Sequence, residues 1–191
     1  MERKTNFLAI GGMALLYLVL VFAACFPGYL HPALWAYFPV IAALVAVFPF
    51  FWIAARWQSF GVGTMLGVVL CLFCLVSGEA QGFWPKAMMV IGGVVADAVR
   101  CVLGNSSKRA LYTAYPFLII GAAGWIVRLW TQPQWYYDNA VEEMGKAYAD
   151  TLIGYSGIGG FLLLVVLIVA ASVAGVWIAA RLMKKSNEML Q

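Results

Sequence analysis

The chain has 191 residues, of which 64% belong to the hydrophobic set and 10% are charged, and its mean hydropathy is +0.90. Soluble domains carry about a quarter charged residues, so this composition excludes a soluble globular domain. The 12 basic residues exceed the 8 acidic ones, but in so apolar a chain their placement matters more than the net charge. We expect a bilayer, and no nucleic acid, as the surroundings of this protein.

Successive apolar runs of roughly 20 residues, the length that crosses a bilayer, predict transmembrane helices. The first run follows three charged residues, but it is longer than a signal-peptide core and no Ala-x-Ala cleavage pattern follows it, so we expect a retained helix. The predicted helices comprise residues 7–26, 33–55, 62–77, 84–103, 110–127 and 157–180. The predicted fold is a single domain, an all-α integral membrane protein with a bundle of six transmembrane helices.

The basic residues predict the orientation, because Lys and Arg near helix ends are retained on the cytoplasmic side. In the six-span arrangement, one side receives Arg3, Lys4, Arg56, Arg100, Lys108, Arg109, Arg181, Lys184 and Lys185. The opposite side is slightly acidic. We therefore expect both termini in the cytoplasm and the chain in the cytoplasmic membrane as a multi-pass protein.

Prolines and small residues interrupt the apolar runs. Pro39, Pro49 and Pro116 each remove a backbone donor, and they are either kinks that shape a cavity or the ordinary prolines of membrane helices. Gly92 and Gly93, like the small residues of 170–175, allow close approach of helix backbones. The pattern indicates a tight bundle.

The segment from Trp130 to Asp150 is aromatic first and then has a mixed-charge helical pattern. We predict a structured outer loop over residues 130–150. The glycine-rich residues 154–160 follow it, so the segment is either a lid over an outward-facing pocket or an interfacial aromatic belt with a flexible turn.

Polar and aromatic side chains gather on the predicted outer side, and a small-molecule pocket needs a few polar groups among apolar and aromatic walls. The candidate substrate-binding residues are His31, Trp35, Glu79, Gln81, Trp84, Arg128, Trp130, Trp135 and Tyr136, with Gln134 at the same level. Arg128 either pairs with a ligand carboxylate or phosphate or extends to the lipid headgroups.

Other reactive residues have plainer interpretations. Cys71 and Cys74 form a Cys-x-x-Cys, but without a nearby Cys or His to complete a ligand set we expect packing residues and no metal site. Asp97 and Arg100 share a helix face, which favours a structural ion pair over a proton relay. No P-loop, zinc-protease or serine-hydrolase motif occurs, so we expect no enzyme and no intrinsic cofactor.

Three segments carry a resemblance to a known family: residues 6–17, residues 92–99 before a basic turn, and residues 144–152 before the last predicted helix. Nearly the whole chain resembles the MptD, or Trep-Strep, family, whose members are assigned as S components of energy-coupling-factor (ECF) transporters. The resemblance implies that the chain captures a substrate from outside, while a transmembrane T component and two cytosolic ATPases drive import. It also implies a scaffold contact through small residues of the first helix, Ala9, Gly11, Gly12 and Ala14.

The resemblance leaves the substrate open between a vitamin-like or other organic micronutrient, which we rank first, and haem. Haem as a transported substrate would place its propionates on Arg128 or Lys86 and its iron on His31 or a tyrosine. A membrane enzyme using Glu79, His31 and Asp138, and a membrane assembly subunit, are the alternatives from other classes. The first needs these side chains within hydrogen-bond reach, and the second predicts an outer cavity that is absent or filled.

Overall fold

The computed structural model describes residues 7–105 and 107–189, with side chains as far as residue 182, and within this part the fold is entirely helical. In chain order the elements are α1 (Phe7–Ala23), η1 (Phe26–Tyr29), α2 (Pro32–Ala36), α3 (Phe38–Val45), α4 (Val47–Arg56), α5 (Val62–Ser77), α6 (Phe83–Leu103), α7 (Lys108–Ala122), η2 (Ala123–Trp125), α8 (Arg128–Thr131), α9 (Pro133–Met144), α10 (Lys146–Ile153) and α11 (Ile158–Met189). The prediction of an all-helical chain is confirmed.

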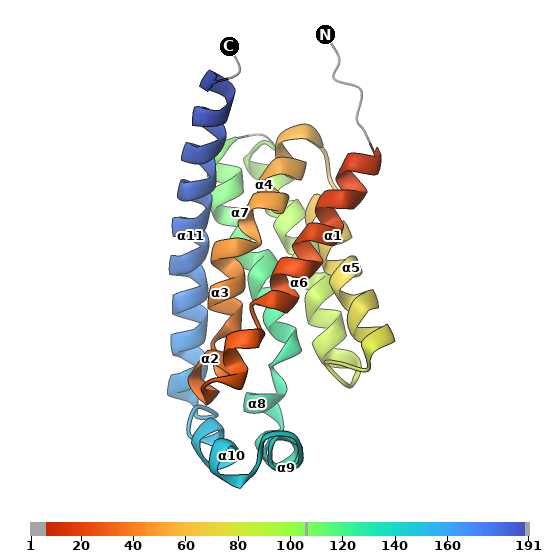
Figure 1. Cartoon of the computed structure of the whole chain (residues 1–191). Coiled ribbons are helices and arrows are strands. Elements are labelled where there is room, and N and C mark those ends of the chain that lie inside the picture. The colour runs from red at the N-terminus through yellow and green to blue at the C-terminus, as the bar shows by residue number, and fades with distance from the viewer. Residues whose placement is uncertain (1–6, 106, 190–191) are drawn as a thin grey trace.

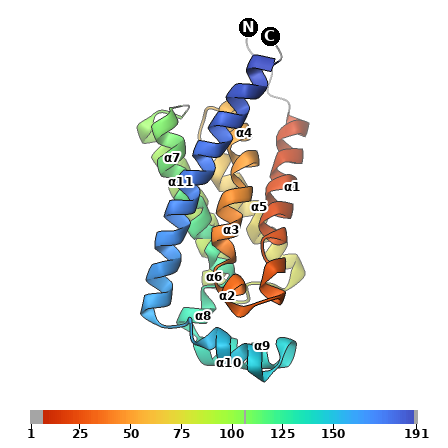
Figure 2. The same cartoon turned by 60° about the vertical axis from the view of Figure 1, so that its left-hand side comes forward.

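The long helices lie side by side, and the short ones close one end of the bundle. Figure 1 shows α1, the pair α3 and α4, α5, α6, α7 and α11 along the long axis, with α9 and α10 lying across the lower end. We call this end the lid end, and the other, where α1 begins and α11 ends, the terminal end. Figure 2 shows the same arrangement after rotation.

Among the described residues, two helical stretches are long and apolar enough to cross a membrane, Phe7–Tyr29 and Ile158–Leu182. The pair formed by α3 and α4 makes a third if its bend of 42° lies within one span. α5, with 16 residues, is a shorter apolar helix. α6 has 21 residues but carries Lys86, Asp97 and Arg100, which raise the cost of burying it in lipid.

The predicted helix 33–55 is divided into α2, α3 and α4. Pro39 cannot donate to the carbonyl of Trp35, and Pro49 cannot donate to that of Val45, so the helical hydrogen-bond pattern is interrupted before each proline. Pro116 lies inside α7, which remains continuous from Lys108 to Ala122. The chain therefore starts a new helix at two of these three prolines, and the angle between α3 and α4 is 42°.

The first helix ends at Ala23 rather than at residue 26, and the two largest other differences are at the ends of the fifth and the last helix. The fifth helix was expected to reach residue 127, but α7 ends at Ala122 and the short elements η2 and α8 follow. The last was expected over 157–180, but α11 extends to Met189. Its 32 residues amount to about 48 Å of helix, and Figure 1 shows that the additional turns project beyond the neighbouring helices at the terminal end. The basic residues Arg3 and Lys4 lie outside the described residues.

Glycines bring α5, α6 and α7 into backbone contact, as the sequence predicts for Gly92 and Gly93. A Cβ added at Gly92 would lie 2.5 Å from the Cα of Gly121 in α7. One added at Gly93 would collide with the carbonyl oxygen of Gly63 in α5. Gly175 in α11 likewise faces the carbonyl oxygen of Ala43 in α3. Such close packing fixes the relative positions of these helices.

The predicted ion pair between Asp97 and Arg100 is confirmed, with 3.1 Å between Oδ1 and Nη1 and both side chains fully buried. Asp97 also accepts hydrogen bonds from the backbone N–H groups of Gly61, Gly63 and Thr64 and from the Thr64 hydroxyl. A carboxylate of α6 therefore caps the first turn of α5. Arg100 extends this junction by donating to the carbonyl oxygen of Trp57, 3.1 Å away.

Candidate functional site

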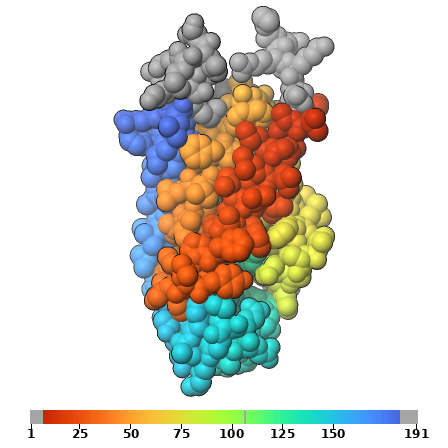
Figure 3. All heavy atoms as spheres, in the orientation of Figure 1, coloured from red at the N-terminus to blue at the C-terminus, as the bar shows by residue number. Residues whose placement is uncertain are grey.

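A cavity of about 170 Å³ lies at the lid end. Its walls come from η1, α2, the loop between α5 and α6, η2, α8, α9 and α10. The lining residues are Gly28, Tyr29, Trp35, Ser77, Gly78, Glu79, Ala80, Gln81, Trp125, Arg128, Trp135, Tyr136, Asn139, Ala140, Glu143, Met144, Tyr148 and Leu152. Figure 3 shows α9 and α10 covering this end of the molecule.

One face of α9 forms a wall of the cavity. Trp135, Tyr136, Asn139, Ala140 and Glu143 line it, at the spacings of three and four residues that share a helix face. Gly145, with φ of +86°, separates α9 from α10, a conformation that glycine adopts without strain. The predicted structured loop is thus a pair of helices with a polar outer face and a cavity-facing inner one.

The loop between α5 and α6 carries Glu79, Ala80 and Gln81 into the cavity. Its backbone alternates through positive φ values, +78° at Gly78, +47° at Ala80 and +92° at Gly82. A positive φ at alanine is costly, and the surrounding structure must hold it. The same loop is tied to α6 because the Lys86 ammonium donates to the carbonyl oxygen of Ala80, 2.9 Å away.

Two of the charged groups of the cavity, Glu79 and Arg128, are each held by a tryptophan. Glu79 accepts a hydrogen bond at Oε2 from the indole N–H of Trp125, 3.2 Å away. The Arg128 guanidinium lies over the Trp135 ring, 4.0 Å from its centroid, and no carboxylate of the described residues forms an ion pair with it. A Cβ at Gly82 would lie 2.8 Å from Arg128 Nη2, and φ at Gly82 is +92°, a conformation that favours glycine at this position.

Two hydrogen bonds connect α9 and α10 to the segment between α1 and α3. The Trp35 indole N–H donates to the Tyr136 hydroxyl at 2.6 Å, and the Tyr148 hydroxyl donates to the carbonyl oxygen of Gly28 at 2.6 Å. Burial raises the pKa of Tyr148 to about 12 and raises that of Tyr136 as well. Both phenols stay protonated at neutral pH, so the Tyr148 hydroxyl keeps the proton that it donates to Gly28.

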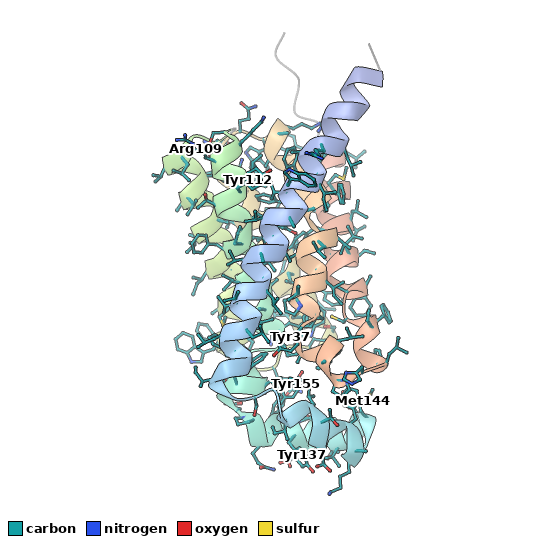
Figure 4. The ribbon with its side chains drawn as sticks, turned by 90° about the vertical axis from the view of Figure 1, so that its left-hand side faces the viewer. Tyr37, Arg109, Tyr112, Tyr137, Met144 and Tyr155 are labelled. Atoms are coloured by element: carbon teal, nitrogen blue, oxygen red, sulfur yellow. The ribbon has the colours of Figure 1, made fainter. Side chains whose placement is uncertain are left out.

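The start of α11 is held by aromatic contacts of its own. Tyr37 and Tyr155 meet edge to face with ring centroids 5.8 Å apart, and Figure 4 shows them together where α11 begins. The Tyr37 hydroxyl donates to the carbonyl oxygen of Gly160 at 3.5 Å. The glycine-rich residues 154–160 are thus attached to the bundle.

Six of the predicted substrate-binding residues line the cavity together, namely Trp35, Glu79, Gln81, Arg128, Trp135 and Tyr136. The other three do not. His31 is exposed, and its Nδ1 accepts from the backbone N–H of Ala33, which caps α2. Trp84 is 72% exposed. Trp130 donates to the carbonyl oxygen of Tyr155 and packs against Phe161, away from the cavity.

The other predicted constellations are not assembled at the cavity. His31 and Asp138 do not line it with Glu79, because His31 caps a helix and Asp138 accepts from Gln134 on the outer side of α9. Lys86 is engaged by the α5–α6 loop and also lies outside the lining. None of the helix-interior prolines lines the cavity.

The small residues predicted to contact a scaffold lie on different faces of α1. Gly11 and Gly12 are exposed, and a Cβ at either would meet nothing within 4 Å. Ala9 is half-buried. Ala14 is 5% exposed and belongs to the core, because it lies on the face of α1 that also buries Ile10 and Tyr17. Ala14 is therefore a packing residue in the bundle.

Sequence reasoning missed several cavity residues, among them Tyr29, Asn139, Glu143 and Tyr148. A signal was present for Asn139 and Glu143, since they follow Trp135 at intervals of four along one helix face. Tyr29 and Tyr148 had none, because the fold brings their segments together from positions far apart in the sequence.

Comparison with known proteins identifies the family. A family model described as "Hypothetical bacterial integral membrane protein (Trep_Strep)" matches residues 5–187. The chain belongs to this family. No curated protein and no solved structure matches it.

Proposed function

Because the chain belongs to a family of bacterial integral membrane proteins, we propose that it is the substrate-binding S component of an ECF-type importer in the cytoplasmic membrane. It captures a small organic micronutrient at the lid end and delivers it through a T component driven by two cytosolic ATPases. The partners follow from the family resemblance of the sequence, and the binding role rests on the cavity.

The cavity is the observation that carries the proposal. An assembly subunit has no use for an open site and would fill this space with side chains, whereas a space of about 170 Å³ lined by Arg128, Glu79 and three tryptophans has the make-up of a ligand site. The hydrogen-bonded helices α9 and α10 over it match a lid that admits and retains a ligand.

We place the lid end outside the cell and both termini in the cytoplasm, with six spans formed by α1, the bent pair α3 and α4, α5, α6, α7 and α11. The exposed basic residues Lys108, Arg109 and Arg181 lie towards the terminal end, which agrees with cytoplasmic retention of positive charge. In α6, Asp97 and Arg100 neutralise each other, and this pairing lowers the cost of placing that helix in the bilayer.

The chemistry of the cavity favours a vitamin-like ring compound over haem. Its charged lining groups are one cation, Arg128, and two carboxylates, Glu79 and Glu143. A ligand with one anionic group can pair with Arg128, whereas the two propionates of haem would share that single cation and be repelled by the two carboxylates. The volume lies below the roughly 300–1,000 Å³ of pockets for drug-sized ligands. His31, the proposed iron ligand, lies outside the lining. We propose a small aromatic ring with an acidic group on Arg128 and hydrogen-bond donors towards Glu79 or Glu143.

The partner interface is proposed on α1. Gly11 and Gly12 form an exposed stretch with open space around it, which allows a helix of a T component to approach closely. The chain has no P-loop of its own, so the proposal assigns ATP hydrolysis to the partner subunits.

The test is to purify the chain from cells grown in rich medium and to record the absorbance spectrum and the mass spectrum of any co-purified molecule. We expect a colourless small molecule that is lost from Arg128→Gln and kept by Lys146→Gln, an exposed cation of α10 outside the cavity. A Soret band lost on His31→Ala would instead establish the haem alternative.

Affinity purification with the chromosomally encoded partners tests the transport role separately. We expect a membrane scaffold and ATPase subunits in the eluate, and fewer of them from a Gly11→Leu, Gly12→Leu variant. If neither a ligand nor these subunits accompany the protein, the proposed function is refuted.

A further inference from the structure

A five-residue segment occurs twice in the chain: Trp-Ile-Ala-Ala-Arg stands at residues 52–56 and again at 177–181. In both copies the arginine lies over the ring of its tryptophan, with 3.7 Å from Cζ to the ring centroid. The four-residue spacing places the two side chains of each pair on one helix face. The first pair is in α4 and the second in α11.

The two copies share this pair and a buried alanine, since Ala54 and Ala179 are both fully buried, but they differ at the isoleucine. Ile53 in α4 is fully buried, whereas Ile178, its counterpart in α11, is 40% exposed. The arginines, in contrast, are exposed in both copies. On the surface, the feature that both copies have in common is an arginine held on a tryptophan.

Both pairs lie towards the same end of the molecule. α4 and α11 pack against each other, and both run to the terminal end, as Figures 1 and 2 show. Figure 4 places Arg109 at this end too, far from Tyr137 on α9. Among the side chains that the structure describes there, Arg56, Lys108, Arg109 and Arg181 are exposed, while the acidic Asp97 is buried against Arg100.

The geometry suits a phosphate group. A stacked guanidinium uses its face for the ring and presents its N–H groups at the edge, where they match phosphate oxygens. Arg56 also donates from Nη1 to the carbonyl oxygen of Trp52 at 3.3 Å, which holds its plane in place. Tryptophan itself is enriched at the level of lipid headgroups.

We propose that the two Trp–Arg pairs, Trp52 with Arg56 and Trp177 with Arg181, form a binding surface for the phosphate headgroups of anionic phospholipids. The surface lies at the end opposite the cavity and is independent of the proposed transport function. The basic surroundings supply the general attraction, and the stacked arginines supply the specific contacts.

Native mass spectrometry of the full chain in detergent, titrated with phosphatidylglycerol or phosphatidylcholine, tests the proposal. We expect a preference for phosphatidylglycerol that falls about five-fold in each of the single variants Arg181→Gln and Arg56→Gln. This factor follows from the roughly 1 kcal/mol that each basic residue contributes near an anionic surface. Lys146→Gln, which removes an exposed cation at the lid end, should leave the preference unchanged.

Trp177→Leu separates the stacked pair from simple charge attraction, because it keeps every charge and removes the ring that orients Arg181. We expect it to weaken phosphatidylglycerol binding and leave helix content and melting temperature unchanged. Equal binding of the two lipids, or equal loss with Lys146→Gln and Arg181→Gln, would overturn the proposal. So would displacement of the lipid by inorganic phosphate at constant ionic strength, which would indicate a site for a soluble anion.

Discussion

Replacing Asp97 by alanine removes the group that joins α6 to the start of α5. The carboxylate accepts from the backbone N–H groups of Gly61, Gly63 and Thr64, from the Thr64 hydroxyl and from Arg100, at 2.8 to 3.1 Å. The substitution therefore uncaps α5 and leaves the Arg100 guanidinium buried without its counter-charge.

The loss is large because both side chains are fully buried. Breaking a buried ion pair by removing one partner costs about 3–5 kcal/mol, and loss of a helix cap by itself costs about 1 kcal/mol. These contributions overlap at one carboxylate, so we expect the free energy of unfolding to fall by about 3–5 kcal/mol in total.

Matched variants separate the parts of this effect. Thr64→Val removes only the hydroxyl bond and should cost about 1 kcal/mol. The double variant Asp97→Ala, Arg100→Met removes both charges, and we expect it to be more stable than Asp97→Ala alone, because no unpaired charge remains buried.

Reversible unfolding in mixed micelles, followed by circular dichroism, measures all four proteins under one condition. The stabilising role of Asp97 is refuted if Asp97→Ala unfolds within about 0.5 kcal/mol of the wild type, the range of an ordinary surface substitution. The cost of leaving Arg100 unpaired is refuted if the double variant is less stable than Asp97→Ala.

Three further predictions concern packing and the lid. Gly67→Ala should lower the melting temperature clearly, because the added methyl group would collide with the Met89 carbonyl oxygen. The control Gly11→Ala, with open space around the added methyl group, should leave the melting temperature unchanged. Equal melting temperatures of the two variants would contradict the close contact between α5 and α6. Tyr137→Phe should raise the pKa of Asp150 towards its ordinary value, because the Tyr137 hydroxyl, 2.7 Å away, is the main cause of its lowering. Carboxyl-carbon NMR measures this pKa. An unchanged pKa of Asp150 in Tyr137→Phe would rule out this hydrogen bond as the cause of the lowering. Since the folded-state pKa of Asp150 is lowered, the contact contributes to stability at pH values above the ordinary 3.8 and loses that contribution as the pH falls through the lowered pKa. The pKa of Tyr148 is raised, so its bond to Gly28 should persist up to pH 10.0, the ordinary value, and be lost as the pH rises towards about 12. The difference in phenolate absorbance between the wild type and Tyr148→Phe, followed against pH, measures the pKa of Tyr148. Ionisation of Tyr148 near pH 10 would contradict the prediction.

The elements that follow from local chemistry could be predicted from the sequence. The Asp97–Arg100 pair lies within one helix, so a spacing of three residues was enough to place it. The capping of α5 by Asp97 was not accessible, because it depends on which helices become neighbours. The division of 33–55 was missed because Pro39 and Pro49 were both placed inside one continuous helix, whereas the helical hydrogen-bond series is interrupted before each of them.

The same distinction applies to the site. Their predicted position on the outer side put Glu79, Arg128 and Trp135 into one candidate set, and the fold places all three around the cavity. His31 and Trp84 belonged to the same predicted level, but depth along the bundle axis does not determine the direction of a side chain. His31 turns back to cap α2, and Trp84 lies on the surface beside Phe83.

The light packing of the lid has a consequence for how the molecule unfolds. Only Ala140 in α9 and Ala149 and Leu152 in α10 are buried, whereas α4 with its 10 residues buries five. So little buried apolar surface means a low free energy of local opening. α9 and α10 should therefore exchange their amide hydrogens as one cooperative unit, well before the bundle does, and the cavity would be exposed to water while the rest of the native structure stays intact.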